Sequence, residues 1–152
     1  MQMKIAIGND HAAVELKNHI AKYLQEKGHE VIDFGIGAGE SVDYPRPGAA
    51  VAKCVVSGGA DRGVLICGTG VGISLAANKV HGARCACVSE AVSARMCRAH
   101  NDCNLIAFGA RIVGEQTAEA IVDAFLNTEH EGGRHARRVE LIMKVEREQT
   151  CD

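Results

Sequence analysis

Aromatic residues are scarce in this sequence, which has three phenylalanines, two tyrosines and no tryptophan among its 152 residues. Proteins that bind single-stranded nucleic acid usually stack its bases on aromatic side chains, so the composition argues against that class. An excess of basic residues is also missing, because the formal net charge is -2. We therefore expect no general attraction to nucleic acid or to an anionic membrane surface, and any anion site must be local.

Long apolar runs are absent as well, since none approaches the ~20 residues that a membrane-spanning helix needs. The N-terminal stretch MQMKIAIGND leads directly into a strand-like run and lacks the cationic start of a secretory signal peptide. The seven cysteines form no Cys-x-x-Cys pair, which argues against a zinc site. A chain of this length can build its core without disulfides. We expect reduced thiols in a cytoplasmic protein.

Strand-like and helix-like segments alternate along the chain. Apolar runs predict five strands, at residues 3–8, 29–35, 62–67, 83–88 and 104–109. Helical patterns are expected at residues 12–27, 48–58, from the following glycine loop to about 79, 90–100 and 115–127. Residues 36–48, which include both prolines, are expected to form a loop. This order predicts an α/β fold with a parallel sheet covered on both faces.

The C-terminal segment differs from the rest, because it begins with Gly132-Gly133 and a basic cluster. Val139, Ile142 and Val145 then recur at intervals of three, which predicts a helix over about 134–148. Such a helix could pack on its own sheet or reach across to a partner subunit.

Ligands of doubly wound sheets bind at the carboxyl ends of the strands. In this sequence that rule selects GNDHAA, CGTGVG, the SEAVSARMCRAHN segment and GARIVG. The CGTGVG loop has glycines that permit tight turns, and the helix after it offers free amides to an anion or an oxyanion. Its spacing is not that of a dinucleotide-binding loop, and no Gly-Lys-Ser/Thr of a P-loop occurs. A purely structural turn is the alternative.

Cys67 ends the third expected strand, directly before this loop. A helix N-terminus can lower the pKa of a thiol, so a thiolate here could serve as nucleophile or base. A small core residue is the alternative interpretation. After the first strand, Asn9 or Asp10 can cap the next helix, and His11 is a candidate anion contact. His100 and Asn101 end the fourth helix, as candidate functional residues or as a simple helix stop.

Arginines complete the set of candidates. Arg111 follows the fifth strand, while Arg134 and Arg138 lie four apart and so share one helical face. Guanidinium groups bind phosphate and carboxylate bidentately, which suggests an anion clamp. The alternative is a solvated basic face that pairs with Glu131 and Glu140.

Together these stretches resemble one family, type B ribose-5-phosphate isomerase with its relatives the allose-6-phosphate and galactose-6-phosphate isomerases. The matching stretches are DH (10–11), DYP (43–45), CGTGVGIS.AANK (67–79), HND.N..AFG.R (100–111) and EGGRH..RV (131–139). They occur in order between residue 4 and about 148.

The resemblance implies a Rossmann-like three-layer α/β/α sandwich with a five-stranded parallel sheet, formed as one domain over residues 1–152. It implies a homodimer or a dimer of dimers. The Gly132-Gly133 hinge and the apolar stripe beyond it lead us to expect the C-terminal helix on a partner subunit. The implied activity is the interconversion of ribose 5-phosphate and ribulose 5-phosphate, with a sugar phosphate as the small-molecule partner and with no metal and no cofactor.

The resemblance also implies roles for individual residues. Cys67 matches the base that moves a proton between C2 and C1, and His100 matches the residue that helps to open the furanose ring. Thr69 is placed with them as an oxyanion donor. The positions that match substrate contacts are Asp10, His11, Tyr44, Gly68, Thr69, Gly70, Val71, Gly72, Asn101, Arg111, Arg134 and Arg138, with His11 and the three arginines on the phosphate side. Some relatives use a glutamate in the glycine loop; here that place is Ile73, which fits the cysteine subtype.

Two alternatives stay open at this point. A six-carbon sugar phosphate differs from ribose 5-phosphate by one CHOH group, which the sequence does not resolve. A protein that binds a phosphosugar or nucleotide without catalysis would keep the same binding residues, although the intact Cys67, Thr69 and His100 argue against it.

Overall fold

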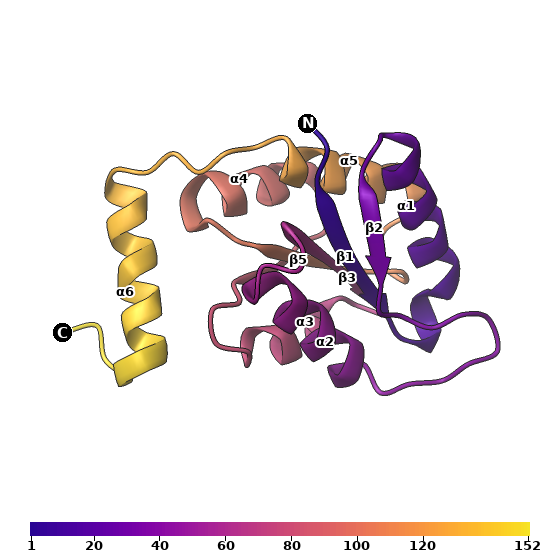
Figure 1. Cartoon of the computed structure of the whole chain (residues 1–152), viewed down its shortest axis with the longest axis horizontal. Coiled ribbons are helices and arrows are strands. Elements are labelled where there is room, and N and C mark those ends of the chain that lie inside the picture. Colours follow the sequence, from indigo (N-terminus) through magenta and orange to yellow (C-terminus); the bar gives the residue numbers. More distant parts are fainter.

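Five parallel strands form a single sheet in the computed structural model, which describes residues 1–152 (Figure 1). The strands are β1 (Lys4–Asn9), β2 (Glu30–Asp33), β3 (Arg62–Cys67), β4 (Cys85–Cys87) and β5 (Leu105–Gly109), in the order β2-β1-β3-β5-β4. Every neighbouring pair is parallel. The predicted α/β class with five parallel strands is therefore confirmed.

Helices cover both faces of this sheet. They are α1 (Val14–Glu26, preceded by the short 3-10 helix η1, His11–Ala13), α2 (Pro45–Val56), α3 (Val71–Asn78), α4 (Ala91–Asn101), α5 (Glu115–Leu126) and α6 (Arg134–Glu148). One core lies between the sheet and α1, α4 and α5, and a second lies between the sheet and α2 and α3. None of these helices is both long enough and apolar enough to cross a membrane.

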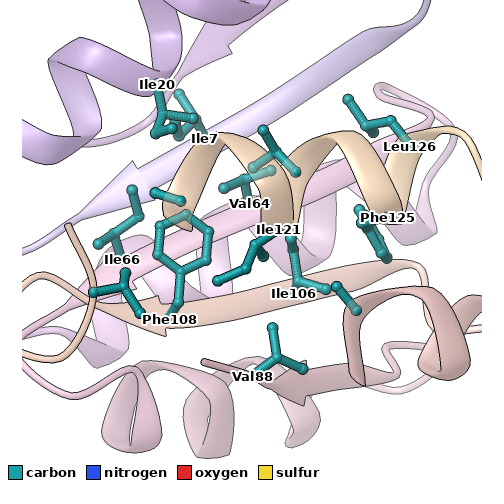
Figure 2. Close-up of a cluster of buried hydrophobic side chains, with 14 of the residues drawn as sticks. Ile7, Ile20, Val64, Ile66, Val88, Ile106, Phe108, Ile121, Phe125 and Leu126 are labelled. Carbon is teal, nitrogen blue, oxygen red and sulfur yellow. The ribbon is translucent and has the colours of Figure 1, made fainter. Parts of the chain in front are cut away.

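Alternation along the strands divides the two cores. Ile5 and Ile7 of β1 point to the α1 side, whereas Ala6 between them points to the α2 side. Figure 2 shows the larger core, in which Ile66 and Phe108 from neighbouring strands meet residues of α5. Burial on both faces explains why the strands read as continuous apolar runs.

The start of α2 corrects the sequence prediction. Residues 36–48 were expected to be a loop, but α2 begins at Pro45 and includes Pro47 in its first turn. The first amides of a helix have no intrahelical acceptor, so proline is tolerated there. The two prolines therefore initiate this helix, and the loop ends at Tyr44.

Helix α6 is mostly exposed. Figure 1 shows it standing away from the α/β body, joined to α5 by an extended segment. His135 is its only buried residue, while Ile142 is 46% exposed and Val145 is 38% exposed. The predicted range, 134–148, is confirmed, and its apolar stripe finds only partial cover on its own chain.

Candidate active site

At the carboxyl edge of the sheet, the topological switch point lies between β1 and β3, which is where doubly wound folds have their ligand crevice. After β1 the chain turns to the face covered by α1, whereas after β3 it turns to the face covered by α3. Loops that diverge in this way leave room for a ligand. The segments on either side of the crevice are Asp10–His11 and Cys67–Gly72, two of the stretches that the sequence selected.

Cys67 is held at this edge by the glycine loop. Its side chain is on the α2–α3 face of the sheet and only 4% exposed. The Gly70 amide donates a hydrogen bond of 3.2 Å to the Cys67 sulfur. The thiol is thus oriented toward the N-terminus of α3, where the first-turn amides lack intrahelical partners.

Two glycines of the loop are required by close contacts. Gly70, the N-cap of α3, has φ 82°, and a Cβ there would lie 2.7 Å from the Phe108 backbone. A Cβ on Gly72 would lie 2.6 Å from the Tyr44 ring, which is half-exposed. The expected placement of Tyr44 near the loop agrees with this contact. Thr69 is exposed, and its hydroxyl accepts a hydrogen bond from the Val71 amide at 3.3 Å.

Asp10 and His11 lie across the crevice from this loop. The Asp10 amide donates to the Ile66 carbonyl at 3.4 Å, and its carboxylate caps η1 by accepting from the Ala12 amide at 3.0 Å. Asp10 is therefore a helix cap, as one interpretation of the sequence held, and its position also faces the candidate site. His11 is exposed, with Nδ1 3.5 Å from the Ser41 hydroxyl.

Arg111 brings a positive charge to the same edge. Its amide donates to the Gly68 carbonyl at 3.0 Å, and its Nη1 would lie 3.4 Å from a Cβ on Gly68. The guanidinium group therefore lies against the glycine loop, where an anionic group could reach it.

Cys87 is a neighbour of Cys67 that the sequence did not single out for the site. Its sulfur is 3.9 Å from the Thr69 carbonyl. Burial, followed by the nearby Cys67 thiol, raises the pKa of Cys87, so its neutral form is favoured. The available signal was the CAC spacing, which puts Cys85 and Cys87 on one face of a strand.

His100 and Asn101 are not with Cys67. They form the last turn of α4, which ends at Asp102 with φ 46°. This turn lies at the amino edge of the sheet, where the Gly63 amide donates to the Asn104 carbonyl at 3.0 Å. Gly63 and Cys67 are about 13 Å apart along β3, at ~3.3 Å per residue. The predicted site residues therefore form two groups at opposite edges of one chain.

Helix α6 belongs to the second group. The imidazoles of His100 and His135 stack with centroids 4.1 Å apart and planes 7° apart. His135 Nε2 is buried without a hydrogen-bond partner and lies 3.5 Å from a Glu131 carboxylate oxygen. Burial, then the charges of His100, Arg134 and Arg138, lowers the pKa of His135. The two arginines of the expected clamp are thus beside His100, both exposed.

His100, Glu131 and His135 could hold a metal ion by geometry, because their ligand atoms lie within 4.8 Å of one another. The positive charges of Arg134 and Arg138 already act on His135. A divalent cation at the same place would be repelled by both. We therefore assign no metal to this cluster.

Comparisons with known proteins identify the family of the chain. The model of the ribose/galactose isomerase family matches residues 5–142. Ribose-5-phosphate isomerase B of Escherichia coli is 52% identical over 94% of this chain and 96% of its own, and D-erythrulose-4-phosphate isomerase of Pectobacterium atrosepticum is 43% identical over 92% and 93%. The structure of Clostridium thermocellum ribose-5-phosphate isomerase B superposes with a TM-score of 0.94 at 53% identity, covering 97% of this chain and all of that one. The chain therefore belongs to the ribose/galactose isomerase family and is an aldose–ketose isomerase of the ribose-5-phosphate isomerase B type.

Proposed function

We propose that the chain interconverts ribose 5-phosphate and ribulose 5-phosphate through an enediolate, with Cys67 as the base. The observation that carries this proposal is the hydrogen bond from the Gly70 amide to the Cys67 sulfur, which orients the thiol at the N-terminus of α3. A base there stands beside oxyanion donors, which is what removal of a proton next to a carbonyl needs.

The proton moves between C2 and C1 of the open-chain sugar. Cys67 as thiolate takes it from C2 of the aldose and returns it to C1 of the enediolate. The hydroxyl proton of O2 passes to O1, so that the C1 carbonyl becomes a hydroxyl and C2 becomes the carbonyl. The Thr69 hydroxyl and the first-turn amides of α3 donate to the oxygens that gain negative charge in between. All bonds made and broken lie within the sugar and these side chains, so the reaction as written calls for no cofactor.

The second group of residues acts in a different copy of the chain. Within one chain, β3 separates His100 from Cys67, and no side chain spans that distance. In a twofold dimer, each partner can present its own group to the other's crevice. Helix α6 has the properties of the arm that does so, because its apolar stripe is only half covered. We propose a homodimer whose two sites are each completed by the partner.

The roles then divide by position. His100 from the partner exchanges the proton that opens the furanose ring, since imidazole can donate and accept protons near neutral pH. The groups that bind the phosphate are His11, Arg111 and the partner's pair Arg134 and Arg138. Asp10, Tyr44 and the partner's Asn101 contact the sugar hydroxyls. Phosphate binding far from C1 and C2 holds the reacting carbons in place.

A substrate panel tests this proposal. We expect the highest kcat/KM for ribose 5-phosphate, compared with allose 6-phosphate, galactose 6-phosphate and erythrose 4-phosphate. The four-carbon sugar is included because a relative at 43% identity is named for one. A clear preference for a four- or six-carbon sugar phosphate would show that ribose 5-phosphate is not the preferred substrate. The proposed proton transfer by Cys67 would be unaffected.

Solvent deuterium distinguishes an isomerase from a protein that only binds a phosphosugar. Reaction in D2O should place deuterium at C2 of ribose 5-phosphate and at C1 of ribulose 5-phosphate. If the protein binds the sugar phosphate but no deuterium enters the sugar, it is a binding protein without catalysis, and the proposed mechanism is wrong.

A further inference from the structure

Two cysteines that the mechanism does not use meet at the end of α4. Cys97 is 6% exposed and Cys103 is 7% exposed, and neither is in a disulfide. The amides of Asp102 and Cys103 both donate to the Cys97 carbonyl, the second at 3.0 Å. Such a hydrogen bond confines the Cα atoms of Cys97 and Cys103 to within about 7 Å of each other. Disulfides span ~4.4–6.8 Å between Cα atoms, so the backbone is already suited to one.

The two thiols also interact with each other. The Cys97 thiol donates a hydrogen bond to the Ala94 carbonyl at 3.2 Å, and it lies close enough to the Cys103 thiol for each to shift the pKa of the other. This contact lowers the pKa of Cys103 and raises that of Cys97, and the charges of Arg84 and Arg98 lower the pKa of Cys103 further against the effect of burial. Cys103 is therefore the more acidic of the two thiols and the one that ionises more readily.

A cavity gives small molecules access to Cys103. It has a volume of about 480 Å³ and lies between α6 and the body of the chain, where Cys103, Cys85 and Asn101 line it with residues of α6. Hydrogen peroxide, which is close to water in size, can enter such a space. A thiolate with an entry path and an adjacent second thiol is the arrangement of redox-reactive cysteines.

We propose that Cys97 and Cys103 form an oxidative modification site that reacts with a hydroperoxide and closes to a reversible disulfide. The Cys103 thiolate attacks a peroxide oxygen, the O–O bond breaks, and an alkoxide or hydroxide leaves and takes up a proton. The Cys97 thiol then loses its proton and attacks the sulfenic sulfur of Cys103, forming the S–S bond and releasing water. Two electrons pass from the two thiols to one peroxide, so the reaction is balanced.

The modification affects the turn that carries His100 and Asn101, because these residues lie between the two cysteines. Closing the bond draws the sulfurs together by more than ~1 Å. A misplacement of about 1 Å can cost on the order of 10²-fold in rate. We expect the disulfide form to isomerise ribose 5-phosphate at least tenfold more slowly, a consequence that rests on the proposed role of His100.

Peptide mapping tests the modification itself. Trypsin cleaves after Arg98 and so separates Cys97, in Met96–Arg98, from Cys103, in Ala99–Arg111. After treatment with a few equivalents of hydrogen peroxide and alkylation, a non-reducing digest should contain these two peptides joined, and dithiothreitol should separate them. If both peptides are alkylated instead, or if Cys103 is joined to Cys85, the proposal is wrong.

Variants separate this site from oxidation of Cys67. Cys103→Ser should abolish the joined peptide, whereas Cys85→Ser, which changes another buried cysteine of the same cavity, should leave it. Wild-type activity should fall with formation of the joined peptide and return with dithiothreitol, and Cys103→Ser should lose this reversible phase. If the joined peptide forms and the activity does not change, the modification site stands but its proposed effect on His100 is wrong. The proposed substrate and the proposed base, Cys67, are not affected by that result.

Discussion

Cys67 illustrates how a single residue can satisfy both interpretations of its sequence. It is buried like a core cysteine, yet its sulfur accepts a hydrogen bond from the loop that follows it. Its position at the end of a central strand was predictable, because strand ends face the ligand edge in this fold. The direction of its thiol was not, since that depends on the positive φ of Gly70 and on the path of the loop.

Replacement of Cys67 should stop proton transfer and preserve binding. A positioned base contributes about 10²–10⁴-fold, so we expect Cys67→Ala to lower kcat by at least 10²-fold with little change in the Kd for the sugar phosphate. Cys67→Ser should be nearly as slow, because a hydroxyl is much less acidic than a thiol. Cys85→Ala is the control, since Cys85 is buried in the same core cluster. Should Cys67→Ala keep more than about a tenth of the wild-type kcat, the base is another group.

His135 should make the stability of the fold depend on pH. Burial and the charges of His100, Arg134 and Arg138 lower its pKa in the folded chain, while Glu131 opposes them. The unfolded chain therefore binds a proton near pH 6.5 that the folded chain does not. Stability from the neutral imidazole is complete above that pH and is lost as the pH falls below it.

Urea unfolding between pH 7.5 and 5 measures this dependence. The wild-type free energy of unfolding should decrease over that range, and His135→Gln should decrease less steeply. His81→Gln, which changes an exposed histidine, should keep the wild-type slope. His29 is half-buried and also has a lowered pKa, so some slope will remain in every variant. Equal slopes in the wild type and His135→Gln would contradict the assignment.

The range of helix α6 could be predicted from the sequence, but its packing partner could not. Its residue range and apolar stripe followed from the sequence, and the structure has the same helix with that stripe half covered. The alternatives of packing on its own sheet or on a partner could not be separated from periodicity, because both need an apolar face. We propose the partner, because only His135 of α6 is buried within the chain.

The two arginines of α6 should act on binding. Loss of a charge-assisted hydrogen bond costs about 1.5–3 kcal/mol, so Arg134→Ala and Arg138→Ala should each raise the KM for ribose 5-phosphate roughly tenfold or more. Arg137→Ala is the matched control, because Arg137 is an exposed arginine of the same helix. Normal kinetics in both variants would mean that these arginines form only a solvated basic face.

At the scale of the whole molecule, the candidate site residues lie at two opposite edges of the sheet. The order of strands and helices predicted a parallel sheet and its ligand edge, and this included Cys67, Asp10 and Arg111. The same pattern contains a signal about His100: a helix after a parallel strand returns antiparallel, so its last turn reaches the amino edge. Which edge of which copy forms a site is a property of the assembly, and no periodicity within one chain specifies it.

Complementation between two inactive variants tests the shared site most directly. Cys67→Ala and His100→Asn, each purified alone, should be nearly inactive on ribose 5-phosphate. When the two are unfolded together and refolded as a mixture, half of the dimers are mixed, and each mixed dimer has one site with both native residues. We therefore expect about a quarter of the wild-type activity to return, as random pairing across a twofold interface requires. If the mixture contains mixed dimers and stays as inactive as its components, Cys67 and His100 act within one chain and the account is wrong.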